Sequence, residues 1–546
     1  MRKTLRNALL LAVLTFVAAM TAQAQTKPDM VLTFPDSLVG ETVEIALGGS
    51  MGDAFQMDWG DGTKQEYTKA NYYSNTLHAN TIKVYGSKIL ILIANNCNLT
   101  GLEINNEPDI YNIKIQNNNL EKLDLSNCER LRGVYAANNK LTSVKLGANT
   151  TSSPSVLDFS NNQLTGTLDL SQWANLSKID ISGCKVEKLL LPNSSVLYQV
   201  LCDDNLLTEL DIAGRTGVDE LSVNGNKLTT LDLTGMTKLT EVHASNNLLT
   251  SVKLDGCTSL EDLSLDGNKL ENVDLSGLAK LEGVYLYNNQ LTSLDLSANN
   301  GVRYLNIDNN KLTSLNTTNL TLLSLLHANN NLIEDVDLTY NTKLTSIQLA
   351  NNKLSEFEPI LATYLSQLRL DGNNIETIDL SGYKSLYWAT LANNKISTLN
   401  LKNNSYLQWL AVENNNLSTL DISKNTGLQG ITIQGNKMQA DAINNIISNL
   451  GDVSGVEINN NNKQFAKQLN ISYMPGTENA NVAEAQAKGW NVTAEKISTG
   501  IERLNSDSNE KPTAIYNISG ERLQKTGKGI NLIKMNDGKV RKIAKN

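Results

Sequence analysis

The residues of this sequence best suited to molecular recognition are aromatic and recur at a fixed spacing. Trp388 and Trp409, two of only five tryptophans in 546 residues, stand 21 positions apart. Three tyrosines occupy comparable positions upstream, and an arginine and a histidine share the pattern. Exposed aromatic side chains with an arginine are typical of the energetic centres of binding interfaces. The predicted ligand-binding residues are Trp388, Trp409, Arg369, Tyr304, Tyr285, Tyr287 and His327.

Catalytic chemistry is not predicted, because no acid, base and nucleophile converge. The chain has three histidines. His243 and His327 fall four repeats apart, roughly 19 Å at one strand spacing per repeat, which is too far to cooperate. His78 lies in a separate N-terminal region. We find no metal-spaced His/Cys cluster, glycine-rich phosphate loop or nucleophile elbow in the sequence. We therefore expect no enzyme activity, no cofactor and no metal.

These residues are positioned by an internal repeat, of which Leu221–Glu241 (LSVNGNKLTTLDLTGMTKLTE) is one copy. It fits the leucine-rich pattern L-x-x-L-x-L-x-x-N/C-x-L. Cys97 and Cys184 take the asparagine position in two copies, which makes 17 turns, and from Cys184 onward the spacing is 21 without a slip. The repeated asparagines are Asn118, Asn139, Asn162, Asn205, Asn226, Asn247, Asn268, Asn289, Asn310, Asn331, Asn352, Asn373, Asn394, Asn415 and Asn436.

The pattern predicts a leucine-rich-repeat solenoid with a curved parallel sheet on its concave face. In each turn two apolar residues alternate with outward ones, which is strand periodicity. In the turn of Glu241, His243 and Ser245, these outward residues define a first, a second and a third row along the sheet. The second half of each repeat is too short for a helix, so we expect a brief strand or extended segment on the convex side. Extra residues around Gly147–Pro154 and Gly166–Thr167 predict a local bulge.

The rows place the aromatic residues in two patches. Trp388 and Trp409 fall in the first row on consecutive strands, about 4.8 Å apart, so we expect their rings to stack on the surface. Tyr285, Tyr287, Tyr304 and Leu325 form a second patch about 19 Å from the tryptophans by the same spacing, with Arg369 between. Alternatively, the rings only pack on one another.

Two polar residues repeat for reasons that we predict to be structural. The asparagine amide can bond backbone groups of neighbouring turns that would otherwise be buried without a partner. An aspartate repeats on the convex side, where it either accepts hydrogen bonds from turn backbone or belongs to a cation-binding ladder. Lysine or asparagine interrupts this row, which favours the turn interpretation. The aspartates are Asp124, Asp169, Asp211, Asp232, Asp274, Asp295, Asp337, Asp379 and Asp421.

Composition excludes some partners. The formal charge is −9 and basic residues form no dense patch, so nucleic acid is not expected. The five cysteines, Cys97, Cys128, Cys184, Cys202 and Cys257, lie too far apart to pair and are predicted to be buried free thiols.

The N-terminal 90 residues precede the repeats. Residues 1–24 read as a signal peptide, with Arg2, Lys3 and Arg6 before an apolar run, and no later stretch is apolar enough to span a membrane. Residues 25–90 alternate like short strands over 42–46, 55–59, 64–67 and 82–85. The segment Trp59–Thr63 (WGDGT) predicts a tight hairpin turn and resembles the turn of PKD-like β-sandwich modules. This region is either a cap over the first turn or a binding module.

The repeats run over residues 91–438 and then decay. We expect residues 439–496 to form a C-terminal cap with helices over 440–450 and 482–488, a strand over 456–458, and Trp490 closing the core. Residues 497–511 are a polar linker. Residues 512–546 predict a small β-domain with strands over 514–518, 530–534 and 539–544.

Three resemblances suggest a function. The LTSLDLS and NNKL motifs resemble those of internalin-type solenoids and of leucine-rich surface proteins of Bacteroidota. The final 35 residues resemble the C-terminal sorting domains of type IX secretion substrates. Those domains usually have tyrosine where this chain has Asn531. The resemblance implies an exported protein, secreted or on the cell surface, that adheres to an extracellular or cell-surface protein. The alternatives are a glycan-binding accessory protein and a passive surface component. The sequence does not define the oligomeric state.

Overall fold

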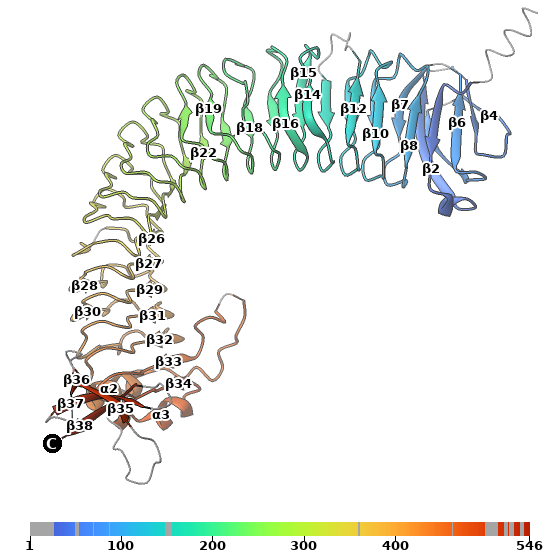
Figure 1. Cartoon of the computed structure of the whole chain (residues 1–546). Coiled ribbons are helices and arrows are strands. Elements are labelled where there is room, and N and C mark those ends of the chain that lie inside the picture. Colours follow the sequence, from blue (N-terminus) through green and yellow to red (C-terminus); the bar gives the residue numbers. More distant parts are fainter. Residues whose placement is uncertain are drawn as a thin grey trace, which may run out of the picture. The chain divides into compact units, whose positions relative to one another are not determined.

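The computed structural model describes residues 27–49, 54–68, 70–86, 88–147, 155–358, 361–460 and 462–496, and the backbone of 512–517, 522–523, 529–535 and 540–545. The predicted signal peptide and linker lie outside these residues. The chain forms two compact units, Met1–Asn352 and Lys353–Asn546. In each unit, successive turns contribute one strand to a parallel sheet (Figure 1).

The first unit builds its sheet from strands that pair in parallel with the strand of the next turn. From β17 onward, residues 21 apart are paired, as Glu220 with Glu241, so each row continues without a change of face. The strands are β7 (Ile89–Ile93), β9 (Asn112–Lys114), β11 (Gly133–Tyr135), β13 (Ser155–Asp158), β15 (Leu176–Asp180), β17 (Gln199–Leu201), β18 (Glu220–Ser222), β20 (Glu241–His243), β22 (Asp262–Ser264), β23 (Gly283–Tyr285), β24 (Tyr304–Asn306), β25 (Leu325–His327) and β26 (Ser346–Gln348).

The second unit continues the same pattern and extends it beyond the predicted repeats. Helices α2 (Ala440–Asn449) and α3 (Val482–Ala487) form as expected, and Trp490 is buried with its Nε1 donating to the Gly451 carbonyl at 2.9 Å. The expected strand over 456–458 is wrong, because this segment belongs to a loop without a neighbouring strand and Ile458 is exposed. The parallel strands are β27 (Gln367–Arg369), β29 (Trp388–Thr390), β31 (Trp409–Ala411), β32 (Gly430–Thr432), β33 (Gln468–Asn470) and β34 (Asn491–Thr493).

The other side of each turn is extended, as predicted, and several turns form two-stranded parallel ladders there. The expected bulge appears between Gly166 and Thr167, where the pairing shifts by one residue. Residues 148–154 of the other expected bulge lie outside the described residues. The strands of this back side are β8 (Gly101–Ile104), β10 (Lys122–Leu125), β12 (Ser143–Leu146), β14 (Thr165–Asp169), β16 (Lys185–Leu190), β19 (Thr230–Asp232), β21 (Ser251–Lys253), β28 (Thr377–Asp379) and β30 (Thr398–Asn400).

The N-terminal strands continue both sides of the first turn. Strand β2 pairs antiparallel with β7 of the parallel sheet, and β1 pairs antiparallel with β8 of the back side. The apolar side chains between these layers, such as Met30, Leu32 and Ile45, are buried. The edge of the first repeat is therefore paired instead of open to solvent. The strands are β1 (Met30–Thr33), β2 (Thr42–Gly49), β3 (Phe55–Asp58), β4 (Gln65–Tyr67), β5 (Asn71–Thr76) and β6 (Thr81–Tyr85).

The WGDGT segment forms the predicted hairpin between β3 and β4. Its positive φ angles belong to Gly60 (102°) and Gly62 (81°), whereas Asp61 keeps an ordinary backbone. Asp58 Oδ1 accepts the N–H groups of both glycines at 2.9 Å. A Cβ atom on Gly60 would lie 2.3 Å from the Ala79 nitrogen, so glycine is required there.

The C-terminal residues form a four-stranded antiparallel sheet in the order β36-β35-β37-β38. Three of its strands match the predicted ones within the described residues, and β36 is additional. The strands are β35 (Pro512–Asn517), β36 (Arg522–Leu523), β37 (Gly529–Met535) and β38 (Val540–Lys545).

The repeated asparagines have the predicted structural role. Asn226 donates from Nδ2 to the carbonyls of Cys202 (2.8 Å) and Val223 (3.1 Å), and its Oδ1 accepts the Leu207 N–H at 3.0 Å. The same three kinds of bond recur in other turns, as at Asn394. Each amide thus pairs backbone groups of two adjacent turns inside the core, where an unpaired group would be costly.

The residue before each repeated asparagine has a left-handed backbone. Asn309, for example, has φ of 56° and Gly225 has φ of 64°. Asparagine, aspartate and glycine are the residues that adopt this conformation most readily, which explains the Asn-Asn and Gly-Asn doublets of the repeat. The exposed amides of these asparagines bond to one another, as Asn309 Nδ2 to Asn288 Oδ1 at 2.7 Å.

A second buried asparagine row, not anticipated from the sequence, lies on the back side. Asn299, Asn341 and Asn404 are 0% exposed. The Nδ2 of Asn299 donates to the carbonyls of Leu275 (3.0 Å) and Leu278 (2.8 Å). These amides close the second bend of the turn, as the repeated asparagines close the first.

The aspartates of the back side act as turn acceptors. Asp232 Oδ1 accepts the backbone N–H and hydroxyl of Thr234, and equivalent backbone bonds recur in seven other turns. An interrupting lysine, Lys253, pairs with Asp232 of the preceding turn at 2.7 Å. The hydrogen bond from Lys253, with those from Thr234, lowers the pKa of Asp232 to about 2. The turn interpretation is confirmed for these eight aspartates. The ninth, Asp211, has Ala213 in place of the Ser or Thr and lies 3.5 Å from Arg215.

All five cysteines are free. Four of them are buried as predicted, while Cys97 is partly exposed, with its Sγ near the Glu44 carbonyl at 3.3 Å. It is less buried because it belongs to the first turn, beside β2 of the N-terminal strands.

Candidate binding surfaces on the sheet face

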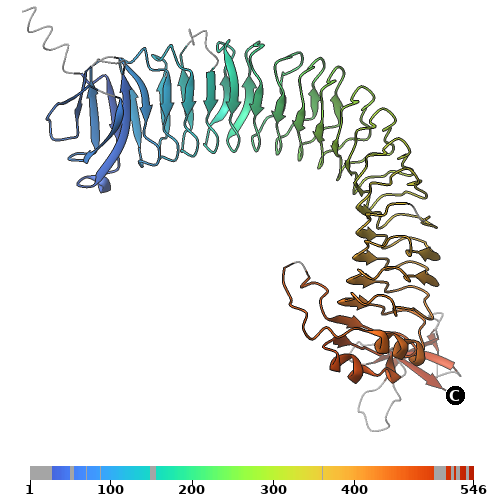
Figure 2. The same cartoon turned by 180° about the vertical axis from the view of Figure 1, so that it is seen from behind.

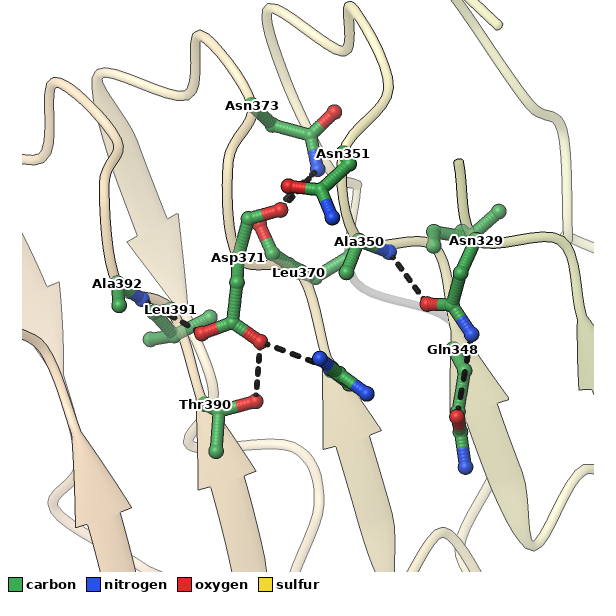
Figure 3. Close-up of polar contacts among 12 residues, drawn as sticks. Asn329, Gln348, Ala350, Asn351, Leu370, Asp371, Asn373, Thr390, Leu391 and Ala392 are labelled. Atoms are coloured by element: carbon green, nitrogen blue, oxygen red, sulfur yellow. Dashed lines mark hydrogen bonds and ion pairs between the residues drawn. The ribbon is translucent and has the colours of Figure 1, made fainter. Parts of the chain in front are cut away.

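The outward side chains of the parallel strands form what we call the sheet face. The third row on this face is largely structural (Figure 3). In the first unit, Asn329 Oδ1 accepts the Ala350 N–H at 2.8 Å. In the second unit, Asp371 Oδ1 accepts the Ala392 N–H at 3.0 Å. Third-row polar groups therefore hold the backbone of the next turn, which leaves the first two rows for recognition.

The tyrosine patch lies in the first unit on β23 and β24. Tyr304 is 45% exposed, and Tyr285 and Leu325 are partly exposed. Tyr285 leans along its own strand over Gly283, where an added Cβ would lie 3.1 Å from the ring. The Tyr287 hydroxyl is hydrogen bonded to Asp266, which raises the pKa of Tyr287. The patch therefore presents Tyr285 and Tyr304, while Tyr287 is engaged within the sheet.

An acidic band adjoins the tyrosine patch and was not among the sites predicted from the sequence. Across β13–β22, outward positions carry several carboxylates and one lysine, Lys178. Burial, with the nearby charge of Glu241, raises the pKa of Asp262. Burial also raises the pKa of Asp180, with Asp158 adding to the effect. The band comprises Asp158, Asp180, Glu220, Glu241 and Asp262 of the first two rows, whereas the third-row Asp203 and Asp266 bond to neighbouring turns.

The two histidines of the second row have different surroundings. His243 Nε2 lies 3.5 Å from Glu241 Oε2. His327 is half-buried, its Nε2 has no hydrogen-bond partner, and burial lowers its pKa although Asp308 opposes the shift. A neutral His327 adds a polar, uncharged group next to Leu325 at neutral pH.

The tryptophan pair of the second unit is covered. Trp388 and Trp409 are neighbours, with ring centroids 6.0 Å apart and planes at 48°. Phe465 packs against both, at 5.1 Å from Trp388 and 5.5 Å from Trp409. Trp409 is only 9% exposed. The expectation that both rings stack on the surface is wrong, because an apolar side chain from an aperiodic loop shields them from water.

That loop connects α2 to β33 and lies over the sheet face (Figures 1 and 2). It projects on the side of β31 and β32, away from β28 and β30. The Lys467 N–H donates to the Gln429 carbonyl at 2.6 Å, and the Lys467 Nζ donates to the Ser454 carbonyl at 3.0 Å. No repeat pattern marked Phe465, so its role could not be read from the sequence.

Arg369 remains exposed on β27. Its Nε lies 3.2 Å from Asp371 Oδ2, two residues beyond Arg369. The Thr390 hydroxyl donates to the same oxygen at 2.7 Å (Figure 3). The guanidinium keeps free N–H groups, because one ion pair uses only part of its donors. Arg369 is therefore held in place by Asp371 and not by the aromatic residues.

A further aromatic and cationic cluster lies at the N-terminal end of the sheet. Lys114 Nζ lies 5.5 Å from the Tyr135 ring centroid, and the Arg132 guanidinium lies 5.6 Å from that of Tyr111. Tyr135 follows Gly133 in the same Gly-Val-Tyr sequence as Tyr285. That repeated tripeptide was the signal that could have identified this cluster.

Two features are absent from the described part of the chain. No group of His, Cys, Asp and Glu there is arranged to hold a metal ion. No helix there has the length and apolar character that crossing a bilayer requires.

Comparison with solved structures decides the fold. The functional domain of InlJ from Listeria monocytogenes, which includes a cysteine ladder, is 20% identical, with a TM-score of 0.52 over 86% of this chain and 93% of that one. The fold is a leucine-rich-repeat solenoid. The predicted likeness to internalins is thus confirmed at the level of the fold.

More distant likenesses include a leucine-rich-repeat protein of Leptospira interrogans (20% identical, 63% of this chain and 83% of that chain, TM-score 0.44). Another is the internalin inlF of Listeria monocytogenes (19%, 64% and 82%, TM-score 0.30). No protein-family profile and no curated protein matches the sequence.

Proposed function

We propose that this chain is an exported, non-enzymatic protein that binds an extracellular or cell-surface protein through the sheet face of Met1–Asn352, and so serves adhesion. The observation that carries the proposal is the exposed Tyr304, with Tyr285, beside the acidic band. A large ring that is 45% exposed on a rigid strand loses no backbone freedom when a partner covers it.

The charge of this surface defines the partner. The acidic band is next to the tyrosines and is balanced at outward positions only by Lys178 and by His243 when protonated. Opposite charge across an interface accelerates association and rejects wrong partners. The partner is therefore a protein with a basic surface that also offers an apolar or cationic contact for the tyrosine rings.

Export is supported by the signal-like residues 1–24, and the antiparallel sheet of residues 512–545 is compatible with the proposed type IX sorting domain. The N-terminal strands are proposed to act as a cap, because they pair with both sides of the first repeat. The chain is proposed to belong among the surface proteins of Bacteroidota that its sequence resembles.

The proposal is tested by measuring binding of the purified chain to a panel of extracellular proteins that spans acidic and basic members. Each hit is repeated with the Tyr285→Ala/Tyr304→Ala variant, for which we expect at least a tenfold loss of affinity. Raising the salt concentration from 0.05 to about 0.5 M should weaken the same hits, because exposed charges are screened.

The matched control is Tyr340→Ala/Tyr406→Ala, which removes two exposed tyrosines of the back turns, 59% and 70% exposed. It should bind as the parent does. If the control variant loses binding as much as the sheet-face variant, the site lies on the back side and the proposal is wrong.

A further inference from the structure

The loop between α2 and β33 and the edge of the sheet line an open pocket of about 740 Å³ in the second unit. One wall is formed by Tyr387, Gln408 and Gln429, each of which directly precedes the first-row residue of its strand. The opposite wall comes from the loop and includes Asn460, Gln464 and Phe465. The volume lies within the range of small-molecule binding pockets.

The side chains of this pocket are neutral and rich in amides. None of the described residues that line it is charged. The amides of Gln408, Gln429 and Gln464 are each at least partly exposed, and none has a hydrogen-bond partner among the described residues. Each amide can donate two hydrogen bonds and accept others, so the pocket is lined by three amides that bond to no other described residue.

The walls are held before any ligand arrives. Phe465 is anchored against both tryptophan rings. Within the loop, Asn462 accepts the Asn459 N–H at 2.8 Å and donates to the Glu457 carbonyl at 2.9 Å. On the sheet side, the Tyr387 hydroxyl is bonded to the Gln367 amide, which orients the tyrosine ring at the pocket wall. A preformed site lowers the entropy cost of binding.

We infer that this pocket binds a neutral glycan, with sugar hydroxyls bonded to the glutamine amides and a sugar face against Tyr387. Vicinal hydroxyls both donate and accept, as the amides do. A charged ligand would leave its charge without a counterion in the pocket, and an apolar ligand would leave the amides unpaired. The glycan alternative thus rests on this pocket and not on Trp388 and Trp409, which Phe465 covers.

The test is calorimetric titration of the full chain with neutral oligosaccharides (maltotetraose, cellotetraose, laminaritetraose and mannotetraose) and with heparin as an anionic probe. We expect binding of at least one neutral oligosaccharide. Gln408→Ala/Gln429→Ala should weaken it by about tenfold or more, since each lost hydrogen bond contributes several-fold.

The matched control is Gln116→Ala/Gln163→Ala, which removes two glutamines of the first unit and should leave the affinity unchanged. A neutral oligosaccharide whose affinity survives the pocket variant would overturn the assignment. So would binding of heparin alone, or no binding of any of these sugars at millimolar concentration.

This inference is independent of the proposed protein-binding surface. The pocket variant alters only the second unit, and Tyr285→Ala/Tyr304→Ala alters only the first. Protein binding that survives Tyr285→Ala/Tyr304→Ala would overturn only the proposed function, and sugar binding that survives Gln408→Ala/Gln429→Ala would overturn only the pocket assignment.

Discussion

At the scale of single residues, buried amides and carboxylates satisfy backbone groups inside the core of this molecule. The asparagine of each repeat bonds backbone groups of two turns, and Glu107 bonds two consecutive backbone N–H groups at the start of β7. Glu107 is 0% exposed, and its Oε2 accepts the N–H groups of Lys88 (3.0 Å) and Ile89 (2.9 Å). Its Oε1 is buried without a partner. Burial raises the pKa of Glu107 to about 7.

Replacing a repeat asparagine should be costly. Asn394→Ala leaves the carbonyls of Leu370 and Leu391 and the N–H of Ile375 without their partners. We expect a loss of about 3 kcal/mol in the free energy of unfolding, measured by denaturant titration. The control is Asn374→Ala at an exposed position of the preceding turn, with an expected change below about 0.5 kcal/mol. Equal losses of stability in the two variants would contradict the structural role of the repeated asparagines.

The pH dependence of stability should reveal Glu107. Because its pKa is raised in the folded chain from 4.5 to about 7, its contribution is fully present below pH 4.5 and is lost as the pH rises through 7. The change is on the order of 3 kcal/mol. In Glu107→Gln, the free energy of unfolding should become flat between pH 5 and 8. Glu103→Gln, at an exposed position of β8, should keep the parental dependence. A flat parental curve would contradict the prediction.

At the scale of elements, each turn is a small loop closed by two bends. A left-handed residue and a repeat asparagine form the bend that follows the strand, and an aspartate with the next Ser or Thr forms the bend on the back side. Hydrogen bonds from those residues lower the pKa of eight aspartates of the back row. The hydrogen bonds of these bends thus stabilise the fold only while the carboxylates stay ionised.

Acid should therefore loosen the turns. A depressed pKa stabilises the fold above the unfolded value, and this contribution is lost as the pH falls toward the folded value. For Asp232 the window runs from 3.8 down to about 2. Lys253→Met removes the ion pair with Asp232 and should shift the midpoint of acid unfolding to a higher pH. Circular dichroism during an acid titration measures this midpoint. The control is Lys280→Met, which replaces an exposed lysine of a later turn. An unchanged acid midpoint in Lys253→Met would contradict a stabilising role of the Lys253–Asp232 ion pair.

At the scale of the whole chain, the parallel sheet and the back-side strands both end in an edge strand, whose unpaired backbone groups would promote aggregation. Strands β2 and β1 cover these edges, because they pair with β7 and β8 of the first repeat. Among the described residues, β35–β38 pair only with one another. The two termini thus differ: the first is built into the sheets, while the pairing of the last strands is self-contained.

Removal of the N-terminal strands should expose two sheet edges. A variant that begins at Lys88 leaves unpaired backbone groups on β7 and β8, and we expect it to self-associate, as measured by light scattering after size exclusion. A variant that ends at Lys496 should remain monodisperse. If the first variant also remains monodisperse, the N-terminal strands are not a cap.

The sequence by itself determined the repeat, the strand register and the roles of Asn226 and Asp232, because residues 21 apart meet in every turn and the pattern therefore reports their contacts directly. It also placed Tyr285 and Tyr304 correctly on the outward rows. Only the tertiary structure decided which outward residues stay exposed. Phe465 reaches Trp409 from an aperiodic loop, and a contact that occurs once in the chain leaves no periodic signal from which it could be predicted.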